Sequence, residues 1–227
     1  VESDQDLTLD VDQLLTKFNK TFPTTKVFSK YARDTLPNPV SAIDDPDSAL
    51  ESWMEHEEIL FRALERSIVK EKLVTGFAEV DDFISFSLSV QNRRKSRVGH
   101  ALENHLSAVF DANAIRYERG ARTENNSRPD FLFPGSLEYH DAEIGSPPLR
   151  MLGAKTTCKD RWRQVLTEAA KIPDKHLFTL ETAISQNQLQ EMHVSSLVLV
   201  STPAVLATYQ APPGMTICLH DFIKIVK

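Results

Sequence analysis

The 227-residue sequence has few of the features that mark secreted, metal-clustered or membrane-spanning proteins. Its two cysteines, Cys158 and Cys218, form no disulfide framework and have no metal-ligand spacing, so we expect reduced thiols in a cytosolic protein. No apolar run approaches the roughly 20 residues of a membrane span, and no signal peptide is visible. The seven histidines show no ligand spacing, and no repeat or low-complexity tract occurs. The remaining composition is that of an ordinary globular protein with one sizeable core.

The chain also lacks the positive net charge that is common in DNA-binding proteins, because its formal charge is −6. Residues 1–60 hold 13 acidic and 5 basic residues, a charge of −8, so the other 167 residues carry +2. Residues 91–165 hold 13 basic residues against 9 acidic ones. Local positive charge governs contact with phosphates, so the middle of the chain remains compatible with nucleic-acid binding.

Three residues with suitable chemistry stand beside predicted strands. Asp130 precedes the apolar run 131–133, Lys155 closes the run 149–155, and Glu168 follows thirteen residues after the lysine. Carboxylates are hard oxygen ligands for Mg²⁺, and a lysine can hold an attacking water and screen a phosphate. Each residue alone is more typical of a turn, a strand end or a helix surface. Together they predict a metal-dependent nuclease, with Asp130 and Glu168 as metal ligands and Lys155 as the catalytic lysine.

Gly153 stands where the commoner nuclease pattern carries a second acid, two residues before the lysine. Strand residues i and i+2 share a face, so an acid at that position would point at the same metal. Glycine offers no ligand. We therefore expect Glu168, on a helix after the strand, to supply the second carboxylate.

The residues around this constellation resemble the catalytic domain of EcoRII-type type II restriction endonucleases. The similarity covers roughly residues 50 to 185 and rests on five segments: 92–97, 129–134, 149–152, 155–164 and 176–180. It implies a homodimeric, Mg²⁺-dependent enzyme of prokaryotic cells, partnered by a cognate methyltransferase. The implied enzyme cleaves double-stranded DNA at CCWGG, where W is A or T, before the first C. The resemblance also implies flipping of the central bases, Asp130, Lys155 and Glu168 as the catalytic core, and Glu103 as a further acid.

The segment after the catalytic lysine is the expected reader of DNA sequence. Lys159, Asp160 and Arg161 lie at or near a predicted helix start. Arginine and lysine donate to guanine O6 and N7, while aspartate accepts from cytosine N4, so the cluster suits the four G·C pairs of CCWGG. The alternative is a solvated helix face, and the resemblance favours base contact.

Further residues are expected around the DNA. The expected contacts to the phosphate backbone are Arg93, Arg94, Lys95, Arg97 and Arg163. Such a basic run is otherwise a solvated face. Tyr139, in the loop between the two catalytic strands, is a candidate contact to the scissile phosphate, and a packing role is equally compatible with its position. Trp53 is a candidate stacking surface for a flipped base, with a core aromatic as the alternative.

Hydrophobic periodicity predicts an α/β core in which a mixed β-sheet is flanked by helices on both faces. The resemblance implies that this core is restriction-endonuclease-like. We divide the chain into a helical lead-in and loop over residues 1–47 and a catalytic domain over 48–227. Ser48 and Glu51 form a predicted capping box. The predicted helices are 48–73, 79–91, 96–113, 160–172 and one between 180 and 196. The predicted strands are 115–119, 129–133, 149–157, 176–180, 196–201 and 215–219.

Two other functions remain compatible with these residues. One is a DNA-binding module that has lost cleavage, against which the intact Asp130, Lys155 and Glu168 argue. The other is a structure-specific repair nuclease, against which the base-reading cluster argues. The chain has no room for the additional N-terminal DNA-binding domain that the best-known family member carries. A separated catalytic domain and a compact relative without that domain are both compatible with the sequence.

Overall fold

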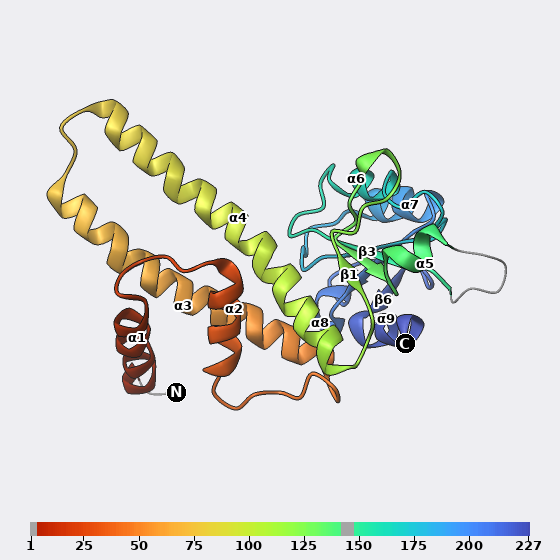
Figure 1. The fold of residues 1–227 in the computed structure, drawn as a ribbon, viewed down its shortest axis with the longest axis horizontal. Helices are drawn as coiled ribbons and strands as arrows, with labels where there is room; N and C mark the ends of the chain where they lie inside the picture. The colour runs from red at the N-terminus through yellow and green to blue at the C-terminus, as the bar shows by residue number, and fades with distance from the viewer. Residues whose placement is uncertain (1–3, 142–147) are drawn as a thin grey trace. The chain divides into compact units, whose positions relative to one another are not determined.

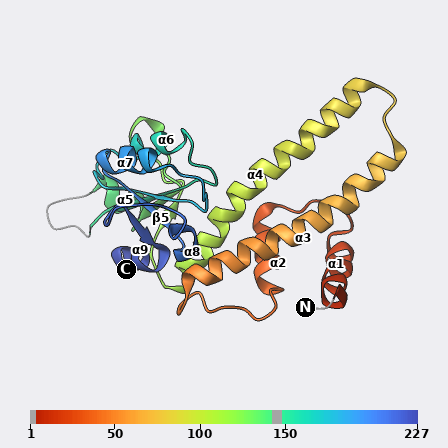
Figure 2. The same ribbon diagram turned by 180° about the vertical axis from the view of Figure 1, so that it is seen from behind.

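The computed structural model describes residues 4–141 and 148–227, which belong to two compact units. The first, here called the helical unit, is built from Val1–Pro39 and Ser52–Asn104. The second, the sheet unit, is built from Val40–Glu51 and His105–Lys227. The predicted boundary between residues 47 and 48 falls inside Val40–Glu51, which the structure groups with the sheet. Figures 1 and 2 show the elements of both units.

The helical unit contains α1 (Asp4–Phe18), α2 (Thr25–Asp34) and most of α3 (Pro46–Thr75) and α4 (Val80–Ala112). Its core is an apolar cluster of residues from α1, α2 and α3: Leu14, Phe18, Phe28, Tyr31, Ala32, Leu60, Phe61 and Leu64. The two predicted helices 79–91 and 96–113 are one continuous helix, α4. The reason is that the polar stretch between them contains no proline or glycine, and its arginines and lysine favour helix.

The start of α3 differs from the predicted capping box at Ser48. The helix begins at Pro46, and the carboxylate of Asp45 accepts a hydrogen bond of 3.0 Å from the backbone N–H of Ser48. Proline suits the first helical position because its missing N–H would be unpaired there. Asp45 is therefore the capping residue, and this bond lowers the pKa of its carboxyl.

The sheet unit is built on a six-stranded mixed sheet in the order β1-β2-β3-β4-β5-β6. The strands are β1 (Glu118–Arg119), β2 (Phe131–Phe133), β3 (Arg150–Ala154), β4 (Lys175–Phe178), β5 (Leu197–Ser201) and β6 (Thr216–Cys218). The pairs β1–β2 and β2–β3 are antiparallel, and β3 to β6 run parallel. All six predicted strands are present, and the predicted mixed α/β fold is confirmed.

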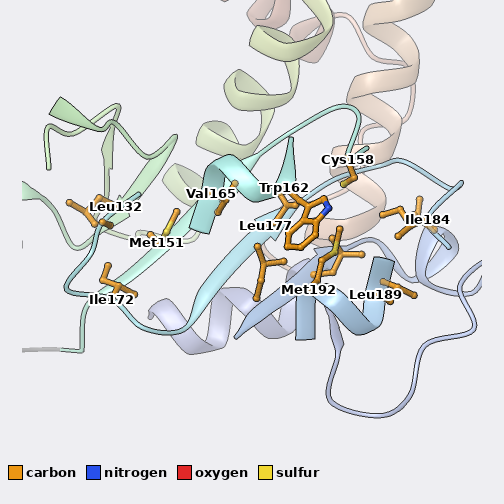
Figure 3. Close-up of a cluster of buried hydrophobic side chains, with 14 of the residues drawn as sticks. Leu132, Met151, Cys158, Trp162, Val165, Ile172, Leu177, Ile184, Leu189 and Met192 are labelled. Atoms are coloured by element: carbon orange, nitrogen blue, oxygen red, sulfur yellow. The ribbon is translucent and has the colours of Figure 1, made fainter. Parts of the chain in front are cut away.

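Helices cover both faces of this sheet. On one face, α6 (Trp162–Leu166) and α7 (Gln186–Val194) pack on a buried cluster shown in Figure 3. On the other face, Phe110 near the end of α4 contacts Phe131, Phe133 and Phe222, the last from α9 (Leu219–Val226). Side chains of successive strand residues alternate between faces, so Leu132 joins the first cluster while its neighbours face Phe110.

Smaller elements complete the unit. They are the 3₁₀ turn η1 (Glu124–Asn126), α5 (Ser136–His140) and α8 (Pro203–Leu206). The predicted helix 160–172 is much shorter than expected, because α6 ends at Leu166 and the chain turns through Ala169 at a positive φ of 48°. Glu168 consequently lies in a turn beyond the helix. Within residues 4–141 and 148–227, no helix has the length and hydrophobicity needed to cross a membrane.

Candidate active site

Asp130 and Lys155 meet at one edge of the sheet because β2 and β3 are antiparallel. Asp130 immediately precedes β2, and Lys155 immediately follows β3, where Phe131 pairs with Leu152. The Asp130 Oδ2 atom accepts hydrogen bonds of 2.6 Å from both the Ala154 N–H and Lys155 Nζ. The side chain of Asp130 is 17% exposed and that of Lys155 is 10% exposed. The predicted carboxylate and lysine are therefore a nearly buried ion pair.

Glu168 brings a second carboxylate close to this pair. Its Oε2 atom is buried and has no hydrogen-bond partner within the described part of the chain. Burial raises the pKa of the Glu168 carboxyl to about 7, while the charge of Lys155 opposes the shift and that of Asp130 adds to it. A buried carboxylate oxygen without a partner is costly, and a bound cation would satisfy it.

The donor set fits Mg²⁺ rather than a metal held by a full protein cage. Among residues 4–141 and 148–227, no group of three or more His, Cys, Asp or Glu side chains could hold a metal ion. Mg²⁺ is commonly bound by one or two carboxylates, with water and substrate phosphate completing its shell. Asp130 and Glu168 are the two carboxylates that would hold it.

Gly153 shows why the strand carries no acid. A Cβ atom built on this glycine would lie 2.7 Å from Cγ2 and 3.2 Å from Cγ1 of Val165 in α6. Val165 is fully buried, so the added atom would force a shift within the packed interior. The close approach of α6 to β3 thus disfavours a side chain at position 153. The same helix leads directly into the turn that carries Glu168.

Tyr139 lies in the short helix α5 rather than in a loop as predicted, and it is fully buried. Its hydroxyl donates to the Glu124 carboxylate and accepts a hydrogen bond of 3.1 Å from the Lys171 N–H. Burial raises the pKa of Tyr139 to about 12. These contacts favour the packing role over the predicted contact to the scissile phosphate, because protein groups already occupy the hydroxyl.

The expected base-reading residues lie on an exposed turn. Lys159, Asp160 and Arg161 stand between β3 and α6, and all three are exposed. Arg163, on α6, forms ion pairs with Asp160 at 3.1 Å and with Glu191 at 2.7 Å. These ion pairs are solvent-exposed and hence weak, so Asp160 and Arg163 are accessible to DNA.

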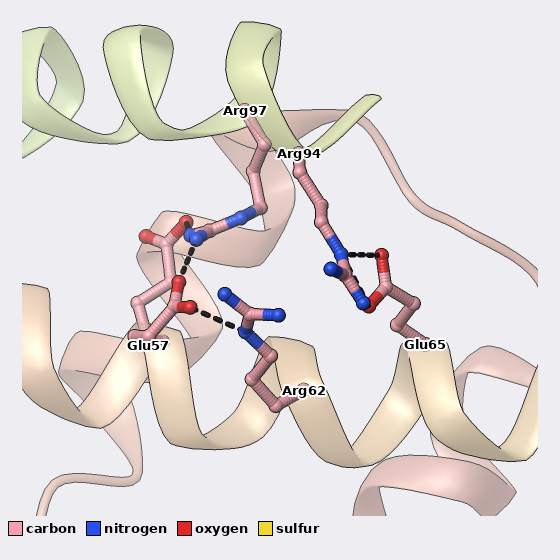
Figure 4. Close-up of polar contacts among 6 residues, drawn as sticks. Glu57, Arg62, Glu65, Arg94 and Arg97 are labelled. Atoms are coloured by element: carbon pink, nitrogen blue, oxygen red, sulfur yellow. Dashed lines mark hydrogen bonds and ion pairs between the residues drawn. The ribbon is translucent and has the colours of Figure 1, made fainter. Parts of the chain in front are cut away.

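Two of the four basic residues of the run, Arg94 and Arg97, point toward α3, as Figure 4 shows. Arg97 is buried and pairs with Glu57 and Glu58 of α3, and Arg94 forms a two-pronged contact with Glu65. Arg94 and Arg97 are three positions apart and share the helix face toward α3. The prediction that Arg97 contacts DNA phosphates is therefore not supported.

The other two members of the run differ from each other. The guanidinium of Arg93 lies 4.1 Å from the ring centre of Phe22, and Lys95 is exposed. The ion pair with Arg97 gives Glu57, a buried acid of α3, a partner of opposite charge.

Two further predicted residues belong to the helical unit. Trp53 is buried, with the guanidinium of Arg33 5.7 Å from its ring centre. This environment favours the core-aromatic alternative over stacking with a flipped base. Glu103 is half-buried in α4, and its role as a further acid stays a prediction.

Two further residues lie near the site, and the sequence pattern gave little indication of either. The Nζ atom of Lys175 donates hydrogen bonds of 2.5 and 2.7 Å to the carbonyls of Glu168 and Ala169. Glu124 accepts from the Ala170 N–H at 3.2 Å. The one available signal is that Lys175 is a charged residue at the start of an apolar strand. The predicted strand began at residue 176 and left this lysine outside.

The fold is shared with solved structures of restriction endonucleases. The structure of metal-depleted Ecl18kI in complex with uncleaved, modified DNA matches with a TM-score of 0.75 at 16% identity, covering 96% of this chain and 82% of that one. The restriction endonuclease PspGI-substrate DNA complex matches with a TM-score of 0.65 at 13% identity, covering 97% and 91%. The chain therefore has the fold of these restriction endonucleases.

Sequence comparison identifies the family within this class. Residues 61–223 match the family described as EcoRII C terminal, and the chain belongs to that family. Type II restriction enzyme EcoRII of Escherichia coli is 47% identical over 157 residues, which cover 69% of this chain and 39% of that protein. Type II restriction enzyme SsoII of Shigella sonnei is 25% identical over 126 residues, covering 51% and 40%. The chain spans about two fifths of the length of these relatives.

Proposed function

We propose that this chain is a type II restriction endonuclease that hydrolyses phosphodiester bonds in double-stranded DNA with Mg²⁺. The observation that carries the proposal is the convergence of Asp130, Lys155 and Glu168 at one sheet edge, with a buried carboxylate oxygen left unpaired. Membership of the EcoRII C-terminal family supports the same activity. The DNA complexes of Ecl18kI and PspGI support duplex DNA as the partner.

Each residue of the site has a separate task. Asp130 and Glu168 would hold Mg²⁺, which supplies positive charge to the phosphate as negative charge grows there. Lys155 Nζ donates hydrogen bonds to the attacking water or to a phosphate oxygen, and its ion pair with Asp130 keeps it at that edge. Low solvent exposure strengthens both contributions, because charges interact more strongly away from water.

The proposed target is CCWGG, cleaved before the first C. Lys159, Asp160 and Arg161 are exposed immediately after the strand that ends at the catalytic lysine, which suits contact with base edges beside the cut. Arg163, Arg93, Arg94 and Lys95 remain the proposed backbone contacts. Two identical chains can each read one half of a nearly two-fold symmetric target, so we propose a homodimer. Its odd central pair would be flipped out, and a cognate methyltransferase would protect the host site.

The test is cleavage of plasmid DNA in Mg²⁺ followed by mapping of the ends. Lys155→Ala and Asp130→Ala should each lose at least roughly 100-fold in rate, the usual consequence of removing a group that stabilises developing charge. Both variants should still bind cognate DNA, because neither group reads bases. Cleavage by either variant within a few-fold of wild type would contradict the assignment. If the wild type binds DNA without cutting it, the chain is an inactive binding module. If DNA shape rather than sequence determines the cut positions, the chain is a repair nuclease.

A further inference from the structure

The turn that carries Glu168 has an unfavourable backbone geometry. α6 ends at Leu166, and Ala169 has a φ of 48°, in the left-handed region that residues other than glycine rarely adopt. The carbonyls of Glu168 and Ala169 lie beyond the end of α6, and that of Ala169 accepts from the Ile172 N–H at 2.9 Å. A turn of this kind needs contacts from outside to hold one conformation.

Lys175 supplies those contacts from the first position of β4. Its Nζ atom donates to the carbonyl oxygens of Glu168 and Ala169, and the residue is only 5% exposed. Lysine is almost never buried unless its charge finds partners. Here the partners are two consecutive carbonyls, one of which belongs to the residue whose side chain completes the metal-binding pair. The ammonium charge also acts on the Glu168 carboxylate.

The opposite side of the turn is held independently. The Ala170 N–H donates to Glu124, and the Lys171 N–H donates to Tyr139, which is itself bonded to Glu124. Ile172 then returns the chain to the buried cluster of Figure 3. Lys175 holds the carbonyl of Glu168, while the Glu168 N–H donates to the Val165 carbonyl of α6 at 3.2 Å.

We propose that Lys175 is a positioning residue for the endonuclease reaction, holding the backbone of Glu168 so that its carboxylate reaches the metal shared with Asp130. The inference rests on the proposed function. A purely structural lysine would affect unfolding alone. A positioning lysine changes metal affinity in protein that is still folded and still binds DNA.

The experiment compares Lys175→Met, which keeps the length of the side chain but removes its donors, with Lys175→Arg, which keeps charge and donors. Lys224→Met removes an exposed lysine of the same unit and serves as control. Mn²⁺ binding is measured by calorimetry without DNA, and cleavage is measured against Mg²⁺ concentration. DNA binding is measured without metal, and thermal unfolding without either ligand.

Lys175→Met should weaken Mn²⁺ binding and raise the half-saturating Mg²⁺ concentration by about 10- to 100-fold, the range seen when a partner of a metal ligand is removed. DNA binding should change by less than about two-fold, and saturating Mg²⁺ should restore most of the rate. The metal affinity of Lys175→Arg should lie nearer to that of wild type, and the metal affinity of Lys224→Met should equal that of wild type. Wild-type metal affinity in folded Lys175→Met would overturn the inference.

If Lys175→Met does not fold, Lys175→Gln decides the question, because its shorter, neutral side chain keeps two N–H donors but loses the charge. Intermediate metal affinity in that variant supports the inference, and wild-type affinity overturns it. Glu168→Gln is measured in parallel. If Glu168→Gln keeps normal activity and metal affinity, the proposed function of Glu168 fails. If only the Lys175 variants behave as wild type, the positioning role fails and the proposed function stands.

Discussion

At the scale of single residues, Glu168 sits where a carboxylate is useful to a metal and costly to the fold. Its folded pKa of about 7 lies above the ordinary 4.5, so the native state binds the extra proton between these values. The stability contributed by this raised pKa is fully present below about pH 4.5 and is lost as the pH rises through 7.

Glu168→Gln cannot ionise and should escape this loss. Without divalent metal, the variant should be more stable than wild type by about 1–3 kcal/mol at pH 8, allowing for partial exposure, and little different near pH 4.5. Urea unfolding at the two pH values measures the difference. Glu55→Gln, on the exposed surface of α3, is the control and should show no such gain. A difference between Glu168→Gln and wild type that does not depend on pH would contradict the argument.

Arg161 and Arg163 are neighbours in sequence that we expect to act differently on DNA. If Arg161 donates to guanine O6 and N7, Arg161→Ala should cost roughly 1–3 kcal/mol of discrimination between cognate and altered sites. Arg163→Ala should weaken binding to all sequences and reduce the salt dependence by about one unit of slope. Binding to cognate and random duplexes over a range of salt concentrations separates the two effects. Equal weakening of both duplexes by Arg161→Ala would remove Arg161 as a base reader.

At the scale of elements, the packing of α6 against β3 sets the position of the turn that carries Glu168. Gly153→Ala should destabilise the protein by about 1–3 kcal/mol, because its new methyl group would overlap Val165. Val165→Ala removes the obstacle at the cost of a cavity, so the double variant should lose less than the sum of the single losses. Urea unfolding of the four proteins completes the cycle. Simple additivity would show that the two positions do not touch.

An acid at position 153 is disfavoured for the same reason. Gly153→Glu would require α6 to move away from the sheet, and with it the turn that carries Glu168. Restoring the commoner strand acid would therefore disturb the packing of α6, which in the proposed function positions the carboxylate of Glu168.

At the scale of the whole molecule, the first half of α4 exposes an apolar stripe. Val80, Ile84 and Leu88 recur at intervals of four and are 72%, 47% and 53% exposed. Exposed apolar patches commonly mark sites of association. If the proposed homodimer uses this stripe, Leu88→Glu should shift the protein from dimer to monomer in sedimentation measurements. Ser89→Glu, on the neighbouring position, is the control. A dimer unaffected by Leu88→Glu would place the interface elsewhere.

Several features of this protein are determined by the sequence alone. Alternating and continuous apolar runs locate all six strands, and Asp130 and Lys155 directly flank two of them. Because strand periodicity and adjacent polar residues are local properties, they can be read without knowing which segments meet in space. The absence of an acid at Gly153 likewise points to a ligand from elsewhere.

Other features were decided by tertiary structure. α6 is five residues long rather than thirteen, since Ala169 turns the chain and Lys175, from the next strand, donates to the carbonyls of Glu168 and Ala169 in that turn. Arg97 faces Glu57, forty positions earlier, instead of solvent. A side chain's partner is set by packing between distant segments, and no local pattern encodes it. The strand ends that carry Asp130 and Lys155 could therefore be predicted from the sequence, whereas the turn that brings Glu168 to them could not.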